Sequence, residues 1–578
     1  MFKAKGGDYG HIHVAFHSRS ASHWLLASLG LVFPAVLTVL IARAAVATPY
    51  QDELTFSTLY GSLAIGAFPP LQELFAAHNG HPSLVLKLLI VFTHQLGLPW
   101  TWMMYAQVAA LVGCVLIVIA QIRASSRFDF CAAALAVTFV LMTPRQWENL
   151  YWSMQLVFPV FLLTSLGAFA CIARYSNSRQ RKWLLSALVL SLLATESNGA
   201  GIFTLALTAT ALLVLRPDRY GVMAIATTAV VGGTLFYVSQ TLAPRSGVGG
   251  NDFALVETIE HVLRMSAHQL ADFPHARVLS ICIGFFLGLL ALYCGIWALR
   301  EWPAAIFETL CIALGIVLIL GVSYVRVAAQ IMQPDAPRYL PLIAPITIGC
   351  VLLFSRWRAA GALVAFASVL LTSYALSLRS EWILGPIRQA NLLAAHSDLC
   401  IGNSGISLVQ SAEYDMSRAA LSDLQKIFCS DGPRSDVVDH NSIASSFALG
   451  YYNEVTQTWI GPEFSIRLPL GRDYASLELN GFLPELGHYS GGRFVLKVWA
   501  DEVAIDERVI SRSGGFSERF GIPPQTAVIR IAGTPLEGRG TDLREISWLL
   551  VSMVFGPVSG SPTSAAATEK SAPMLGPT

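Results

Sequence analysis

The feature that most constrains the fold is a series of long apolar runs in the first two-thirds of the chain. A helix that spans the hydrocarbon core of a bilayer needs about 20 mostly apolar residues, within a usable range of about 17 to 25. On that basis the sequence predicts eleven membrane-spanning helices, with soft boundaries. Their approximate ranges are 23–45, 101–122, 128–143, 156–172, 183–195, 201–215, 220–242, 278–299, 304–324, 340–355 and 359–378.

The composition supports this interpretation. The chain has 578 residues, of which 54% are hydrophobic and 13% are charged, whereas a typical soluble domain has about 25% charged residues. So much apolar surface does not fit inside ordinary soluble cores, and a polytopic membrane protein is expected. The net charge of +1 gives no indication of nucleic-acid binding. The first run exceeds the roughly 7 to 15 apolar residues of a signal peptide, so we expect it to remain as a span.

The basic residues predict the orientation of these spans. Lys and Arg residues gather before the first run and in alternate connections, which the positive-inside rule places in the cytoplasm. They are Lys3, Lys5, Arg19, Arg123, Arg127, Arg174, Arg179, Arg181, Lys182, Arg216, Arg219, Arg300, Arg356 and Arg358. We therefore expect a multi-pass protein of a bacterial inner (plasma) membrane with a cytoplasmic N-terminus, residues 1–22. This pattern requires residues 83–97, about 15 residues long with Lys87 and His94, to be an amphipathic helix in the outer interface.

With this topology the polar residues gather on the outer face. The clusters are Asp52-Glu53, residues 78–82, residues 144–155, residues 196–199, and Arg326 with residues 335–339. Polar and ionisable groups beside membrane spans are costly unless they have a role, so an outward-facing site is the simplest common cause. Each cluster also has an ordinary alternative, because Trp and Tyr anchor spans at the interface and loop carboxylates are commonly solvated.

The composition changes after Arg379, where charged and turn residues become frequent and no further span follows. The predicted order is a transmembrane domain (23–379) with outer loop 46–100, a periplasmic segment of mixed helix and loop (380–448), a β-sandwich (449–556) and a disordered tail (557–578). Short alternating strands near 464–468, 476–479, 494–499, 503–505, 528–531 and 548–555 indicate a jelly-roll-like sandwich. Such a module binds or supports more often than it catalyses. A disulfide between Cys400 and Cys429 is compatible with the oxidising periplasm.

Nucleotide-binding motifs do not occur in the sequence. There is no Gly-rich loop ending in Gly-Lys-Ser/Thr, no Gly-x-Gly-x-x-Gly after a strand, and no Cys/His zinc framework. Energy for chemistry on the outer face must then arrive with the substrate. A lipid carrier with an activated sugar phosphate meets this need, because it diffuses in the bilayer and brings its own leaving group.

Three short motifs, in this order and on this side of the spans, resemble the GT-C membrane glycosyltransferases, which include the protein O-mannosyltransferases and the lipid A aminoarabinose transferase. They are Asp52-Glu53 in the first outer loop, His81-Pro82-Ser83-Leu84 before the interfacial helix, and Arg338-Tyr339 before a late span. The resemblance covers about residues 1–379. The C-terminal sandwich is similar to carbohydrate-binding modules that some relatives carry.

The resemblance implies that Asp52, as the first acidic residue of the loop, is the general base for the acceptor. Glu53 orients the acceptor or exchanges roles with Asp52. Arg338 is the expected phosphate ligand, because a guanidinium binds phosphate oxygens in a bidentate fork at any relevant pH. Arg326 is a second candidate and Tyr339 adds a hydrogen bond. A solvated acid and snorkelling or anchoring side chains are the alternatives.

Further candidates for substrate binding come from the other outer clusters. They are His78, His81, Trp147, Glu148, Asn149, Gln155, Glu196 and Asn198. Aromatic rings stack on sugars, and carboxylates and amides bind hydroxyl groups. His78 and His81 form a His-x-x-His pair that suits a metal on a helix, but no third ligand is evident and Pro82 favours an extended backbone. No cofactor is assigned; a divalent cation stays an open alternative.

The sequence therefore predicts an integral-membrane glycosyltransferase with a polyprenyl-phosphate-linked sugar donor and a cell-envelope glycan or lipid acceptor on the outer face. Membrane lipids are its other expected partners, and nucleic acid is not. The alternatives are a transporter or flippase of lipid-linked oligosaccharide and a polysaccharide-binding membrane scaffold. A transporter favours broken helices with polar groups at mid-span, whereas the runs here are mostly uninterrupted.

Overall fold

A computed structural model of the chain divides into two compact units, Met1–Pro386 and Ile387–Thr578. The structure describes residues 21–47, 56–78, 81–124, 126–242, 254–268, 270, 277–328, 336–401, 424, 427–428, 458–460, 463–467, 474–483, 493–501, 503–512, 514–526, 528–534 and 548–557. Asp52, Glu53 and Cys429 lie outside these residues, so the acidic pair and the disulfide stay predictions.

Each of the eleven apolar runs forms a helix, as the sequence predicts. The helices are α1 (Ala21–Ala44), α5 (Trp102–Ile119), α6 (Arg127–Leu141), α8 (Val157–Ser178), α9 (Arg181–Ser197), α10 (Gly201–Val214), α11 (Arg219–Leu242), α13 (Arg277–Arg300), α14 (Ile306–Ala328), α15 (Leu340–Arg356) and α16 (Ala360–Ile401). By length and composition, seven described helical segments suffice to cross a membrane: Trp102–Ile119, Ser153–Ser178, Arg219–Leu242, Arg277–Arg300, Ile306–Ala328, Pro337–Arg356 and Ala360–Gly385. The chain is a multi-pass membrane protein. Helix α16 continues past residue 379, where the sequence indicated the end of the membrane domain.

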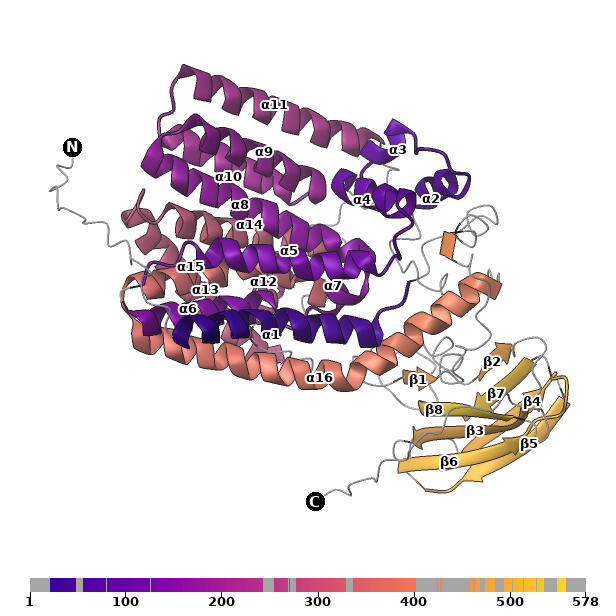
Figure 1. Ribbon diagram of the computed structural model, residues 1–578. Coiled ribbons are helices and arrows are strands. Elements are labelled where there is room, and N and C mark those ends of the chain that lie inside the picture. Colours follow the sequence, from indigo (N-terminus) through magenta and orange to yellow (C-terminus); the bar gives the residue numbers. More distant parts are fainter. Residues whose placement is uncertain are drawn as a thin grey trace. The chain divides into compact units, whose positions relative to one another are not determined.

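Short helices connect the long ones at one end of the bundle. They are α2 (Ser57–Ala64), α3 (Leu71–Phe75), α4 (Leu84–Gln95), α7 (Trp147–Tyr151), η2 (Ser153–Leu156) and η3 (Pro337–Tyr339). Helices α2, α3, α4 and α7 lie at the same end of the bundle (Figure 1). Contacts between distant connections also form there, because Ala77 N donates to Ser239 O at 2.9 Å and Arg145 Nη1 donates to His268 O at 2.6 Å. We call this the polar end.

Helix α12 (Leu255–Ala267) also lies in the bundle, and the sequence analysis did not predict it. Its apolar residues occur on one face only, so its overall hydrophobicity stays below that of a span. The buried face packs against α13 and α14. His261 Nδ1 lies 2.9 Å from Ser323 Oγ of α14.

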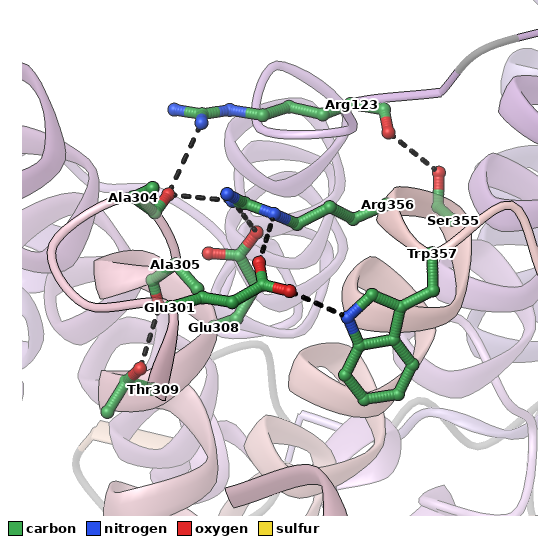
Figure 2. A network of polar contacts seen from close by, with 9 residues as sticks. All are labelled: Arg123, Glu301, Ala304, Ala305, Glu308, Thr309, Ser355, Arg356 and Trp357. Carbon is green, nitrogen blue, oxygen red and sulfur yellow. Dashed lines mark hydrogen bonds and ion pairs between the residues drawn. The ribbon is translucent and has the colours of Figure 1, made fainter. Parts of the chain in front are cut away.

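The basic connections meet at the opposite end of the bundle, which we call the basic end. Figure 2 shows how Arg356, at the end of α15, lies between Glu301 and Glu308. Its Nε lies 2.6 Å from Glu301 Oε2, and its Nη1 donates to Ala304 O at 2.8 Å. Arg123 Nη1, after α5, donates to the same carbonyl at 3.2 Å. The alternate connections singled out by the positive-inside rule thus share one end of the fold.

Local sequence accounts for helix starts at the basic end. Ser126 Oγ accepts a hydrogen bond from Asp129 N at 3.0 Å and caps α6. Asp218 Oδ1 accepts from Gly221 N at 2.9 Å in the first turn of α11. Both side chains satisfy backbone N–H groups that have no partner within the helix.

The second unit contains two four-stranded antiparallel sheets, with strand orders β1-β8-β3-β6 and β2-β7-β4-β5. The strands are β1 (Thr458–Ile460), β2 (Glu463–Arg467), β3 (Tyr474–Leu483), β4 (Phe494–Ala500), β5 (Val503–Ile510), β6 (Gly514–Gly521), β7 (Val528–Gly533) and β8 (Trp548–Pro557). Leu477 and Leu479 of one sheet and Leu496 and Val498 of the other are buried. The ring centroids of Phe494 and Phe516 lie 6.2 Å apart, so the core forms between the two sheets.

A substitution of Gly284 in α13 tests how α12 packs in the bundle. A Cβ atom at this position would lie 1.8 Å from Leu263 O, whereas a Cβ at Gly288, one turn later, meets nothing within 4 Å. We expect Gly284→Ala to lower the free energy of unfolding by about 1 to 3 kcal/mol, because the helices must separate. Gly288→Ala is the matched control and should leave the melting temperature in detergent unchanged or slightly raised. Equal melting temperatures for the two variants would contradict this packing.

Candidate functional site

A buried ion pair at the polar end joins two helices that are far apart in sequence. Arg338 Nη1 of η3 lies 2.9 Å from Glu148 Oε2 of α7, and the two side chains are 19% and 10% exposed. Asn149, the next residue of α7, donates from Nδ2 to Arg338 O at 3.4 Å. Pro337 in η3 sets φ near its helical value just ahead of Arg338. Residues that the sequence analysis placed in separate clusters therefore meet.

Tyr339 lies between two cations. Its ring is buried, and the guanidinium carbons of Arg326 and Arg338 each lie 5.3 Å from the ring centroid. Arg326 comes from the last turn of α14 and is half-buried. Among the described residues Arg326 forms no ion pair, so its charge is available to a ligand. The three residues predicted to hold a phosphate are thus neighbours.

Two aromatic rings flank the short helix α7. The ring centroids of Trp147 and Trp152 lie 6.2 Å apart with their planes nearly perpendicular. The edge of one ring therefore packs on the face of the other, a common arrangement for aromatic pairs. Gln155, the last of the predicted residues in this segment, is buried in η2. All four predicted residues of 147–155 thus belong to one compact segment.

A second group forms where His81 and Pro82 meet the turn after α9. His78 and His81 exchange backbone hydrogen bonds of 2.8 Å in both directions, and the ring of His78 lies 4.6 Å from that of Phe56. A Cβ atom on Gly199 would lie 2.7 Å from His81 Nδ1, so only glycine permits this approach. The predicted residues of these two clusters are therefore neighbours.

Glu196 lies in the last turn of α9, and Asn198 follows the end of that helix. Asn198 Oδ1 accepts a hydrogen bond from Ala200 N at 3.0 Å, which orders the start of α10. Glu196, just past the apolar run 183–195, is buried and its Oε1 has no hydrogen-bond partner among the described residues. Burial raises the pKa of Glu196 from 4.5 to about 7. A carboxyl group that titrates near neutral pH is a candidate functional group.

Lys87 is a structural residue, which the sequence analysis used only as a sign of an interfacial helix. It is buried in α4, and its Nζ donates to Glu73 O and, at 2.9 Å, to Ala76 O. Its Nζ also lies 3.7 Å from Glu73 Oε1 and 5.4 Å from the ring centroid of Phe56. Burial lowers the pKa of Lys87, and Glu73 opposes this shift. A lysine inside a run of apolar residues was the available signal.

Gln107 and Arg145 were also missed. Gln107 of α5 is fully buried and donates from Nε2 to Trp152 O at 2.6 Å. Arg145 donates to His268 O from the loop before α7. Both tie α7 to other helices. Gln107 is the sole amide within Trp102–Ile119, which was the signal for it.

The described residues contain no group of three or more His, Cys, Asp or Glu side chains that is placed to hold a metal ion. His78 and His81 pair through their backbones, in the extended arrangement that Pro82 favours. This geometry differs from two histidines on one helical face.

Comparison with known proteins identifies no family for the chain. No family model matches it, and no curated protein matches it. Among solved structures, the chain is similar to the cryo-EM structure of the arabinosyltransferase EmbB from Mycobacterium smegmatis, at 12% sequence identity and a TM-score of 0.35. The match covers 94% of this chain and 65% of that one. At this level of similarity the function must be argued from the site itself.

The Glu148–Arg338 pair should be energetically coupled. Removing one partner leaves the other charge buried, which costs about 3 to 5 kcal/mol in a protein interior; partial exposure of Arg338 places the expected loss at the lower end. We expect Glu148→Ala and Arg338→Ala each to lower the free energy of unfolding, and the double variant to lose less than the sum of the two. Denaturant titration in mixed micelles measures this coupling.

The control for this cycle is the exposed pair Lys497–Glu507, whose charges lie 3.0 Å apart with side chains 47% and 54% exposed. Solvent screening limits such a pair to about 1 kcal/mol or less, so Glu507→Ala should have little effect. Strict additivity of the Glu148 and Arg338 variants would show that the ion pair does not form.

Glu196 should make stability depend on pH. Because the pKa is raised in the folded state, the folded chain binds more protons than the unfolded chain between about pH 4.5 and 7. Stability should therefore fall as the pH rises through this window and then level off. Glu196→Gln should remove this contribution. The melting temperature of the variant minus that of the wild type should therefore increase from pH 4.5 to 7.5. A constant difference across that range would contradict the burial of the carboxyl group.

Proposed function

We propose that the chain is an integral-membrane glycosyltransferase of the GT-C type, which moves a sugar from a polyprenyl-phosphate-linked donor to a cell-envelope glycan or lipid on the periplasmic face of the inner membrane. One observation carries this proposal. Arg326 and Arg338 both lie against Tyr339 at the polar end of a membrane bundle, beside Glu148 and Asn149. This arrangement offers cations for a phosphate next to groups that bind sugar hydroxyls.

The charges of this group suit a phosphodiester. Arg326 and Arg338 contribute two positive charges and Glu148 one negative charge, which leaves a net charge of about +1. A sugar linked to a lipid through one phosphate carries a single negative charge. A guanidinium has five N–H donors, so Arg338 keeps donors for phosphate oxygens while one nitrogen faces Glu148. In this arrangement Glu148 orients the side chain of Arg338, which binds the phosphate.

An apolar cavity supports a lipid-linked donor. It has a volume of about 620 Å³ and is lined by residues of α13 and α16, including Phe286, Val369 and Leu376. A smaller pocket shares Ser373 with this cavity and reaches Leu340, which follows Tyr339. A polyprenyl chain is the proposed occupant, because its phosphate then lies toward the two arginines while its tail stays in apolar surroundings.

In the proposed reaction a carboxylate of the first outer loop, Asp52, takes the proton of the acceptor hydroxyl. The acceptor oxygen forms a bond to the anomeric carbon of the sugar, and the bond from that carbon to the phosphate oxygen breaks. The electron pair stays on the phosphate, whose added negative charge Arg338 and Arg326 stabilise. Glu53 orients the acceptor or replaces Asp52 as the base.

The remaining predicted residues are proposed to contact the sugar and the acceptor. Trp147, Glu148, Asn149 and Gln155 belong to the segment next to Arg338, and we assign them to the sugar of the donor. His78, His81, Glu196 and Asn198 form the second group, and we assign them to the acceptor. A neutral Glu196 can donate as well as accept a hydrogen bond, which suits a hydroxyl-bearing ligand.

We infer that the two sheets of the second unit form a jelly roll that binds carbohydrate outside the membrane. The inference rests on the strand orders, because β1-β8-β3-β6 and β2-β7-β4-β5 are two sheets of four strands joined by Greek-key connections. Such a module would hold a long glycan acceptor. The domain limits 380–448, 449–556 and 557–578 remain part of this proposal.

The acidic pair provides the test of catalysis. Asp52→Asn keeps the size of the side chain but removes the base, and we expect transfer in reconstituted membranes to fall by about 100-fold or more, within the range for general-base catalysis. Size-exclusion profile and melting temperature should stay those of the wild type. Glu257→Gln, which changes an exposed carboxylate of α12, is the matched control and should keep full activity. Full transfer by Asp52→Asn would exclude Asp52 as the base.

A further inference from the structure

Three buried amide side chains at the polar end have carbonyl oxygens that accept no hydrogen bond within the described part of the chain. Gln107, Asn149 and Gln155 are 0%, 0% and 3% exposed. Gln107 Oε1, Asn149 Oδ1 and Gln155 Oε1 accept no hydrogen bond from any residue that the structure describes. An unsatisfied buried polar group costs about 1 to 3 kcal/mol in general, so such groups are rare unless something outside the chain satisfies them.

The three amides belong to elements that touch one another. Helix α5, which carries Gln107, contacts both α7 and η2, which carry Asn149 and Gln155. Trp152 O accepts from Gln107 Nε2 at 2.6 Å and from Gln155 N at 3.2 Å, so these two residues meet at one carbonyl. Asn149 Nδ2 faces Arg338 O at 3.4 Å. The set thus adjoins the proposed phosphate ligand.

The orientation of two of these amides is fixed by chemistry. A backbone carbonyl accepts hydrogen bonds and donates none, so the nitrogen of Gln107 must face Trp152 O and its oxygen must point elsewhere. The same reasoning fixes Asn149 against Arg338 O. The oxygens left over are therefore acceptors, and no described residue supplies a donor to them.

We propose that Gln107, Asn149 and Gln155 form an acceptor set that binds the hydroxyl groups of a neutral sugar, with Gln107 as a specificity-determining residue. This inference rests on the proposed function, because it concerns the donor whose phosphate Arg338 holds. Sugar hydroxyls supply donors to carbonyl oxygens, whereas the carboxylate of an acidic sugar brings only negative oxygens. The set therefore selects neutral sugars over uronic acids.

Binding separates this inference from the proposed activity. The probes are undecaprenyl phosphate and undecaprenyl phosphate linked to glucose, mannose, galactose or glucuronic acid, each added to the full-length protein in nanodiscs and measured by native mass spectrometry. For the wild type we expect at least one neutral sugar to bind about two- to tenfold more tightly than undecaprenyl phosphate, and glucuronic acid to give a smaller gain because one of its donors is replaced by a carboxylate.

The variants are Gln107→Met and Gln155→Met, which remove an acceptor at similar volume and serve as two independent tests should one variant fold poorly. In each variant the affinity for the sugar-linked lipid should fall about two- to tenfold, while the affinity for undecaprenyl phosphate should stay that of the wild type. Thr208→Val is the matched control, because Thr208 is also a fully buried polar residue of a membrane helix, and its hydroxyl oxygen has no hydrogen-bond partner in the described ranges. This variant should bind the sugar-linked lipid as tightly as the wild type does.

Four outcomes would overturn the inference. If both methionine variants keep the full gain for the sugar, or if glucuronic acid binds as well as a neutral sugar, the amides are not the sugar site and the proposed function still stands. If a density map with the bound sugar lipid shows ordered waters retained on the three oxygens, the amides hold structural water only. If the wild type binds none of the lipid phosphates, the proposed function fails together with this inference.

Discussion

The ion pair between Glu148 and Arg338 is the interaction on which the polar end depends. It connects α7 to η3. Segment η3 leads directly into α15, and α7 leads through η2 into α8. A charged pair of this kind contributes little net stability, because the loss of hydration offsets most of the attraction. Its effect is on geometry. With Arg338 held by Glu148, the guanidinium also faces Tyr339, and the backbone carbonyl of Arg338 remains available to Asn149.

The membrane constrains where such interactions occur. Long apolar helices satisfy their own backbone groups, so charged and amide side chains are concentrated at helix ends, where connections meet. The two ends then differ in composition. At the basic end, Arg356 and Arg123 both donate to Ala304 O, and Arg356 also pairs with Glu301 (Figure 2). These contacts join separate connections of the bundle. At the polar end, buried amides and a buried carboxyl have oxygens without a hydrogen-bond partner among the residues that the structure describes, which is the pattern expected of a site that receives a ligand.

Much of this arrangement follows from the sequence, for physical reasons. Every long apolar run is a helix because nothing else buries so many consecutive apolar residues with a satisfied backbone. Helix α12 was missed because half of its surface is polar, and β6 was missed because its three glycines and two charges interrupt the alternation. Arg326, Arg338 and Tyr339 were predicted as one site. The pairing of Arg338 with Glu148 was not, since 190 residues separate them and only packing brings them together.

The acceptor set shows why such pairings matter for specificity. Gln107 comes from a membrane helix, and a single amide in an apolar run looks like a tolerated exception in the sequence. Its meaning depends on Trp152 O, which accepts a hydrogen bond from the amide nitrogen and so fixes the position of an oxygen that has no donor among the described residues. A cationic group that binds phosphate does not distinguish one sugar phosphate from another. Discrimination between sugars requires fixed, uncharged acceptors beside the cations, and the amides of α5, α7 and η2 are placed to supply them.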